Sequence, residues 1–348
     1  MKRTLRTTII FLLLLSFSFR SVAQTFETPV QYMDYISKAN SELTAKYLVY
    51  LSAVSHGKSA RKVEKRRAEV VNAISDTRYS IMGMGPWKGD RSLKDTTVAY
   101  LKILHIVFNE DYGKIVNMEE IAEQSYDAME AYMLAQEKAQ EKLADASKRQ
   151  QEMQKVFAAK NNINLVDDES ELEAKSKIVD AVMDHCNEVY LLFFKPYKQE
   201  DYLMEAMSKK NLVSLEQNIN SLKKFSEDGL EKLKGLKGYQ NDASLIAACR
   251  NALNFYKMEA GKGSAMSDYF LKEEDFNKIK KQFEATPSGK RTQQAVDQYN
   301  NAVNDINKSL NNYNAVNADL NKQRTAALND WNKTYSKYMD EYMPKQQR

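Results

Sequence analysis

The strongest constraint on the fold is the long stretch from Val296 to Tyr342, which contains neither Pro nor Gly. Every third or fourth residue of this stretch belongs to a heptad seam typical of coiled coils, and only Asn317 and Arg324 interrupt its apolar character. The seam consists of Val296, Tyr299, Val303, Ile306, Leu310, Tyr313, Asn317, Leu320, Arg324, Ala327 and Trp331. A single helix of this kind, about 75 Å long, can bury its apolar stripe only against partner helices. The rest of the chain is therefore expected to lie alongside it.

The composition favours an all-α fold for the whole chain. Only 11 Gly and 5 Pro occur among 348 residues, and straight-chain helix formers are abundant. The length is sufficient for two domains, each with its own core. The order of helix starts and breaks predicts two tandem antiparallel helical bundles at 28–161 and 170–343, joined by a linker at 162–169, with the long helix at the C-terminal end.

Residues 1–23 have the order of a signal peptide. Basic residues precede a short apolar run at 9–19, and small residues at 21–23 predict cleavage between Ala23 and Gln24. A membrane anchor is the alternative, but the run is too short to span a bilayer. Cleavage would remove four basic residues, Lys2, Arg3, Arg6 and Arg20, and lower the formal net charge from +4 to zero. The expected location is the periplasm, the cell surface or the extracellular space, and the charge gives no support to nucleic-acid binding.

The two cysteines, Cys186 and Cys249, would be free to pair in an exported protein. They fall on the first and third helices of the second predicted bundle, and such helices are diagonal in a simple up-and-down bundle. A disulfide needs Cα atoms within about 7 Å of each other. This geometry favours two buried thiols over a bridge and leaves the bridge as the alternative.

Breaks and capping residues divide each half of the chain into helices. The first half is expected to hold helices at 28–55 and 59–82, a third that starts near Asp90 or Ser92, and a fourth from about Asp111 to Lys160 with a break near Ser125. The second half is expected to hold helices that start at about 170 and 214, two more at 242–260 and 266–284, and the long helix.

The two halves repeat each other at a spacing near 150 residues. The clearest match is an aromatic-x-x-Asp-x-Ser-Leu motif, which begins at Trp87 and again at Tyr239. Further matched pairs are Met33 with Met183, Val63 with Leu215, Asp111 with Asp268, and Tyr132 with Tyr299. Chance similarity between two helical segments is the alternative, but the shared order favours an internal duplication. In the motif, the aromatic residue is expected to close the end of its bundle while Asp or Ser caps the next helix.

The chain resembles a family of uncharacterised secreted helical surface proteins from Bacteroidota and from Leptospira-type spirochaetes. The resemblance covers most of the mature chain, and five segments carry it: Ser55–Glu64, Val98–Lys102, Asn109–Tyr112, Ile121–Tyr132 and Asp330–Lys333. The resemblance implies a helical fold and a secreted or cell-envelope location. It implies no catalytic or binding residues.

Motifs for catalysis, cofactors and metals are missing from the sequence. His56, His105 and His185 lack the spacing of a zinc-protease or di-iron site, and there is no Cys-x-x-Cys, P-loop or Gly-x-Ser-x-Gly. Asp180, Asp184 and Glu188 form a carboxylate row that is more typical of a solvated helix face than of a weak cation site. The sequence therefore predicts no enzyme, no cofactor and no bound metal.

A basic helix start is the candidate partner surface. It consists of Lys58, Arg61, Lys62, Lys65, Arg66 and Arg67, against a single Glu64. An acidic stretch at 110–130 either neutralises these residues or leaves them free for an anionic protein, glycan or lipid headgroup. The expected function is that of a secreted or cell-envelope interaction protein. The alternative is a periplasmic carrier that holds an apolar or amphipathic ligand in a bundle core.

Overall fold

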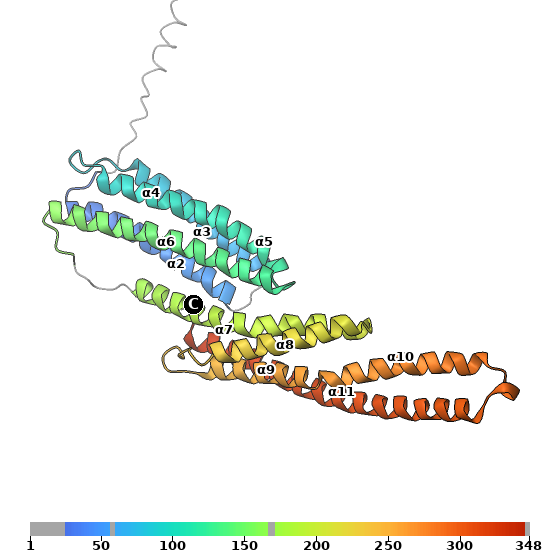
Figure 1. Cartoon of the computed structure of the whole chain (residues 1–348). Coiled ribbons are helices and arrows are strands. Elements are labelled where there is room, and N and C mark those ends of the chain that lie inside the picture. Colours follow the sequence, from blue (N-terminus) through green and yellow to red (C-terminus); the bar gives the residue numbers. More distant parts are fainter. Residues whose placement is uncertain (1–24, 56–59, 166–170, 345–348) are drawn as a thin grey trace, which may run out of the picture.

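The computed structural model describes residues 25–55, 60–165 and 171–344. These ranges are almost entirely helical and contain no strand, as the composition predicts. The predicted signal peptide with its cleavage site, Lys58 and the second half of the predicted linker lie outside the described residues. The structure groups the helices into two tandem bundles, while the exact linker boundaries stay a prediction (Figure 1).

The first bundle consists of α2 (Pro29–Ser55), α3 (Ala60–Gly83), α4 (Ser92–Ile106), a π-helical turn (Val107–Asp111), α5 (Tyr112–Ala122) and α6 (Tyr126–Lys160). The expected helix boundary near Asp111 is wrong, because α4 continues through the π-helical turn into α5. The break that was also expected near Ser125 is confirmed: the Ser125 hydroxyl accepts a hydrogen bond from the backbone N–H of Ala128 and caps α6. The third and fourth helices of this bundle are therefore 92–122 and 126–160.

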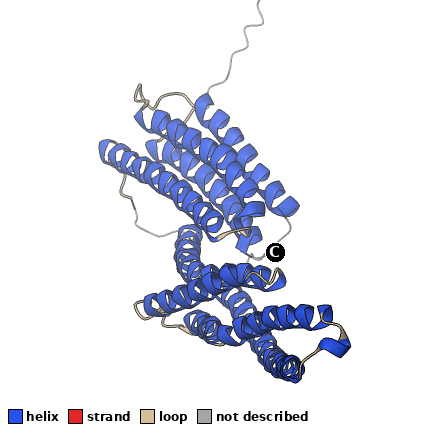
Figure 2. Cartoon of the chain, turned by 45° about the vertical axis from the view of Figure 1, so that its right-hand side comes forward, coloured by secondary structure: helices blue, strands red, loops and turns tan. Residues whose placement is uncertain are grey.

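The second bundle consists of α7 (Glu171–Ser208), α8 (Leu212–Lys232), α9 (Ser244–Gly261), α10 (Gly263–Ala285) and α11 (Gln293–Tyr342). The predicted long C-terminal helix is confirmed as the 50-residue α11. A short 3-10 turn, Ser288–Lys290, lies in the connection from α10 to α11. Figures 1 and 2 show α10 and α11 extending beyond the ends of α7 and α8 as a paired arm.

The repeated aromatic motif adopts the same turn in both bundles. Trp87 pairs with Asp90 in one backbone bridge, and Tyr239 pairs with Asp242 in the other. The residues between them, 88–89 and 240–241, all have positive φ, which is the geometry of a tight primed turn. The Asp carboxylate then accepts the backbone N–H at the start of the next helix, from Ser92 at 2.8 Å and from Ser244 at 2.7 Å.

The last helix of each bundle returns to this turn. In the first bundle, Lys160 lies 3.3 Å from the second oxygen of Asp90, and Trp87 Nε1 donates to Asn161 at 2.8 Å. In the second bundle, Tyr342 donates to the second oxygen of Asp242 at 3.0 Å. The two bundles therefore share helix order, turn and closing contact, in agreement with the predicted duplication.

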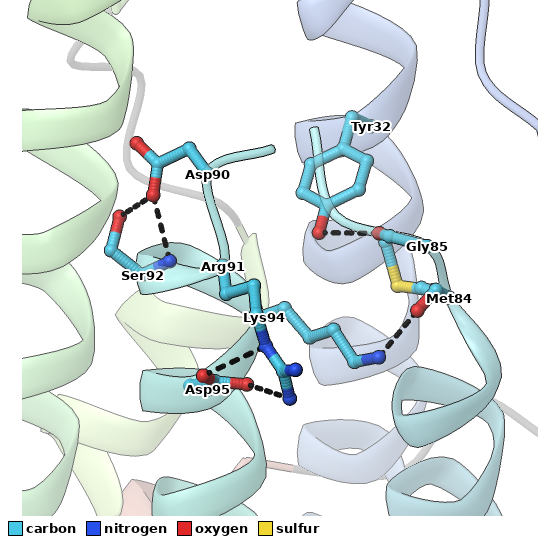
Figure 3. A network of polar contacts seen from close by, with 8 residues as sticks. All are labelled: Tyr32, Met84, Gly85, Asp90, Arg91, Ser92, Lys94 and Asp95. Carbon is cyan, nitrogen blue, oxygen red and sulfur yellow. Dashed lines mark hydrogen bonds and ion pairs between the residues drawn. The ribbon is translucent and has the colours of Figure 1, made fainter. Parts of the chain in front are cut away.

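Further polar contacts hold the turn of the first bundle in place (Figure 3). The Tyr32 hydroxyl of α2 donates to the carbonyl of Gly85 at 3.2 Å, and the Lys94 ammonium donates to the carbonyl of Met84. Trp87 is 7% exposed and its ring lies 6.0 Å from that of Tyr32. The predicted role of Trp87 in closing the bundle is thus confirmed.

We expect Asp90→Ala and Asp242→Ala each to lower the free energy of unfolding by about 1 kcal/mol, because each removes the carboxylate that caps the following helix. Asp95→Ala is the matched control, since its ion pair with Arg91 is exposed and contributes about 0–1 kcal/mol. Urea titration followed by circular dichroism measures the difference. If only one of the two Asp variants lost stability, the two motifs would not have the same structural role.

The halves differ mainly in the arm. α10 has 23 residues against 11 in α5, and α11 has 50 against 35 in α6. The two helices of an antiparallel helical hairpin must lengthen together. The greater lengths of α10 and α11 therefore represent one extension of the second bundle. Tyr299 lies in this extension, with its ring 4.4 Å from that of Phe283, whereas Tyr132 packs against the core. These two residues, matched in sequence, do not occupy equivalent positions.

The two cysteines are buried and unpaired. Cys186 on α7 has its sulfur 3.6 Å from that of Met339, and Cys249 on α9 has its sulfur 3.7 Å from the carbonyl oxygen of Val189. Burial raises the pKa of each thiol to about 12. The structure thus has the two buried thiols that the sequence favoured.

Candidate functional site

In the described part of the basic helix start, some side chains form ion pairs with nearby carboxylates and others do not. Arg61, Lys62 and Lys65 are exposed at the start of α3, and none of them forms an ion pair with a described residue. These three residues are referred to below as the α3 basic group. All three side chains are exposed, so a partner could reach them.

Arg66 and Arg67 do not belong to this free surface. Arg66 pairs with Glu69 at 2.6 Å. Arg67 forms two bonds to Glu64, and its Nη1 donates to the carbonyl of Phe108 at 2.6 Å. That carbonyl lies in the π-helical turn, where backbone groups lose their regular helical partners. The structure therefore gives Arg67 a structural role, although the sequence placed it on the partner surface.

The acidic stretch at 110–130 has other partners. Asp111 pairs with Lys142 at 2.7 Å, and Glu130 accepts a hydrogen bond from Tyr126 at 3.2 Å. The side chains of Glu119 and Glu120 lie outside the description. The π-helical turn at the start of this stretch contacts α3 through the bond from Arg67 to Phe108, while the rest lies on α5 and the start of α6, which pack against each other. Among the described carboxylates of this stretch, none pairs with the α3 basic group.

A buried charged cluster lies inside the second bundle and joins three helices. Arg324 of α11 binds both Glu200 of α7 and Glu259 of α9. The side chains of Arg324, Glu200 and Glu259 are 17%, 6% and 0% exposed, respectively. The Arg324 guanidinium also lies 5.7 Å from the ring of Phe255. We call these three charged residues the Glu–Arg–Glu cluster.

The Glu–Arg–Glu cluster holds one positive group for two carboxyl groups. Burial, followed by repulsion from Glu200, raises the pKa of Glu259 to about 8. A neutral Glu259 makes the cluster neutral at pH 7, which avoids an uncompensated buried charge. Glu259 Oε2 and the Tyr256 hydroxyl are both buried without a hydrogen-bond partner. The cluster fixes α7, α9 and α11 against one another.

Sequence reasoning identified one of the three members. Arg324 stood out as a polar break in the seam of α11, but Glu200 and Glu259 were missed. A buried Arg requires acidic partners on the facing helices. This requirement could have directed the search to carboxylates on the apolar faces of the other helices. Glu259 follows Tyr256 by three residues on the apolar face of α9, so its position in the helical pattern would have distinguished it from the exposed carboxylates.

A cavity of about 290 Å³ lies where α6 of the first bundle meets α7 and α8. Its residues are Tyr126, Leu191, Leu192, Lys195, Phe225, Asp228, Gly229, Glu231 and Lys232. The Lys195 ammonium lies 4.3 Å from the centre of the Tyr126 ring and 4.6 Å from that of Phe225. Lys195 therefore connects the two bundles through cation–π contacts. The cavity lies at the junction of the two bundles and not inside the core of one bundle, where a carrier would hold its ligand.

Other predicted features have no defined site in the described ranges. Asp180, Asp184 and Glu188 are exposed, and no three His, Cys, Asp or Glu side chains in the described part of the chain are arranged to hold a metal ion. Although Asp180 reaches solvent, it lies near Tyr47 and Tyr112 of the first bundle, and this partial desolvation raises its pKa, with repulsion from Asp184 adding to the effect. A search of the described helices finds none with the length and apolar character needed to cross a bilayer.

Comparison of the chain with models of known families, with curated proteins and with solved structures gives no significant match.

Proposed function

We propose that this protein is a non-catalytic helical interaction protein of the cell envelope or the secreted fraction, which binds an anionic surface component through the α3 basic group. The observation that carries the proposal is the exposure of Arg61, Lys62 and Lys65 without described ion-pair partners. Three like charges on about one and a half helical turns attract an anionic protein, glycan or lipid headgroup. Nucleic acid is not the proposed partner, because the mature chain is formally neutral.

The packing supports an interaction protein over a carrier. Trp331 of α11 stacks on Phe193 of α7 with ring centroids 4.2 Å apart, and both side chains are buried in one continuous apolar cluster. The Glu–Arg–Glu cluster occupies another level of the same bundle. A carrier needs an apolar space at such positions. The second bundle instead fills them with aromatic rings and paired charges.

Reversing the α3 basic group is expected to weaken envelope binding at least tenfold. The variant is Arg61→Glu, Lys62→Glu and Lys65→Glu, and the effect should fade in high salt because exposed charges are screened over about 8–10 Å. Co-sedimentation of purified mature protein with envelope fragments at low and high salt measures it. The three residues are exposed, so the helical circular-dichroism signal should stay unchanged.

The matched control reverses three exposed basic residues of α6: Lys148, Arg149 and Lys155. It changes the net charge by the same amount at another surface. If both variants lose envelope binding equally, the effect belongs to total charge and the α3 basic group is not the site. Unchanged binding in the α3 variant would also contradict the proposal.

The proposed export rests on the charged, apolar and small-residue order of residues 1–23. We expect N-terminal sequencing of the native protein to begin at Gln24. An intact Met1 in protein from the cytosolic fraction would overturn this part of the proposal.

A further inference from the structure

The arm formed by α10 and α11 leaves its apolar seam partly open. Along the body of the second bundle, Leu320, Trp331 and Tyr338 of α11 are 0%, 2% and 2% exposed. In the arm, the seam residues Val303 and Ile306 are only half-buried, because α10 is the main neighbour of α11 there. Figure 1 shows the two ribbons leaving the bundle together. One side of α11 in the arm is therefore available for packing.

The face beside this seam carries an unusual row of side chains. Five exposed asparagines follow each other at spacings of three or four residues and form one stripe along the helix. The asparagine stripe consists of Asn300, Asn304, Asn307, Asn311 and Asn314. Ser309 is buried and donates to Asp268 of α10 at 2.8 Å, which places α10 on another side of the helix. Ser309 is about 200° from Asn307 at 100° per residue, so the stripe faces away from α10.

Helix stability does not account for this stripe. Asn is among the weaker helix formers, and solvated helix faces normally carry charges. Asp305 and Lys308 are the charged residues between 298 and 318, whereas 28% of the whole chain is charged. The partner helix α10 has the usual pattern, with pairs such as Lys278 with Glu274 and Lys280 with Glu284. Depletion of charge is a property of protein interfaces.

We propose that the asparagine stripe is a self-association surface, against which α11 of a second copy packs in antiparallel orientation. A two-fold symmetric interface must be complementary to itself. Carboxamides satisfy this requirement because each one both donates and accepts hydrogen bonds. The edges of Val303 and Leu310, which lie between the stripe and α10, add apolar contact. Because this part of α11 carries few charges, two identical faces do not repel each other. For the same reason, the face offers few ion-pair partners to a charged protein.

The size of the stripe fits a reversible dimer. From Asn300 to Asn314 the helix is about 22 Å long, and half the girth of a helix is about 17 Å, which gives roughly 370 Å² per copy. The total of roughly 750 Å² is below the standard size of stable interfaces and corresponds to a weak, transient dimer. The dimer should therefore form in a concentration-dependent way.

Two charged variants of the stripe test the proposal. Asn304, Asn307 and Asn311 are changed together, to Asp in one variant and to Lys in the other. We expect sedimentation velocity of the mature wild-type protein to show a monomer–dimer equilibrium, and each variant to raise the dissociation constant at least 100-fold. An equimolar mixture of the two variants should recover dimers, because opposite charges then face each other.

The control changes three exposed amides outside the arm, Gln151, Gln217 and Asn220, to Asp. It should dimerise like the wild type. The equimolar mixture also controls for misfolding, because two misfolded variants would not form dimers when they are mixed. A wild-type protein that stays monomeric at about 100 μM, well above the micromolar dissociation constants of weak complexes, overturns the proposal. Dimers that survive both triple changes, or a mixture that stays monomeric, overturn it equally.

Discussion

Arg324→Met is expected to lower the free energy of unfolding of the second bundle by about 3–5 kcal/mol. The change removes the positive group that binds Glu200 and Glu259 while it keeps an unbranched side chain of similar length in the seam of α11. Two carboxyl groups then remain buried without their partner. Such a loss is larger than that of an exposed ion pair, which contributes about 0–1 kcal/mol.

The two tryptophans allow the effect to be assigned to one bundle. Trp87 lies in the first bundle and Trp331 in the second, so a Trp87→Phe background leaves Trp331 as the sole fluorescent reporter of the second. Guanidinium titration in this background measures the loss. The control variant Glu200→Leu, Glu259→Leu and Arg324→Met removes all three charges and should recover most of the stability. A single Arg324→Met variant within 1 kcal/mol of its parent would show that the cluster is not an essential buried pair.

The second bundle is expected to become less stable as pH rises from about 5 to 8. An ordinary Glu side chain has a pKa of 4.5. In the folded protein, burial and then repulsion from the nearby Glu200 raise the pKa of Glu259 to about 8. Between these values the folded protein holds a proton that the unfolded chain has released. The stability from this proton is therefore complete below pH 4.5 and lost once the pH exceeds about 8. The slope is at most about 1.4 kcal/mol per pH unit.

Glu259→Gln provides the control for this pH dependence. A Gln side chain keeps the shape and the hydrogen-bonding capacity of the neutral acid but does not titrate, so its variant should have a flatter profile over the same range. Guanidinium titrations at several pH values, followed by Trp331 fluorescence, give both profiles. Parallel slopes for wild type and variant would assign the pH dependence to another group.

Several features of the fold followed from the sequence because they depend on local chemistry. The heptad seam predicted α11, since a stripe with that period can be buried only on a long helix. Breakers and caps predicted most helix ends to within a few residues. The motif at Trp87 and Tyr239 predicted a shared turn, and its Asp residues cap the following helices in both bundles.

Other features depended on which side chains meet in three dimensions. A helix boundary was expected near Asp111, but a π-helical turn continues the helix past this residue. Arg67 of α3, about 40 residues earlier in the chain, donates a hydrogen bond to the carbonyl of Phe108 in this turn. This contact removed Arg67 from the predicted partner surface. The pairing of Arg66 with Glu69 removed a second residue, while Arg61 and Lys65 stayed free.

By itself, the sequence determined the helical class, the tandem order of the bundles and the absence of known catalytic motifs, because periodicity and capping act between residues close in the chain. Only the tertiary structure decided the partners of Arg324, which lie 65 and 124 residues away, and the exposure of the asparagine stripe. Long-range contacts and exposure depend on how whole helices pack. The pattern along one helix shows which face is polar but does not show whether another helix covers it.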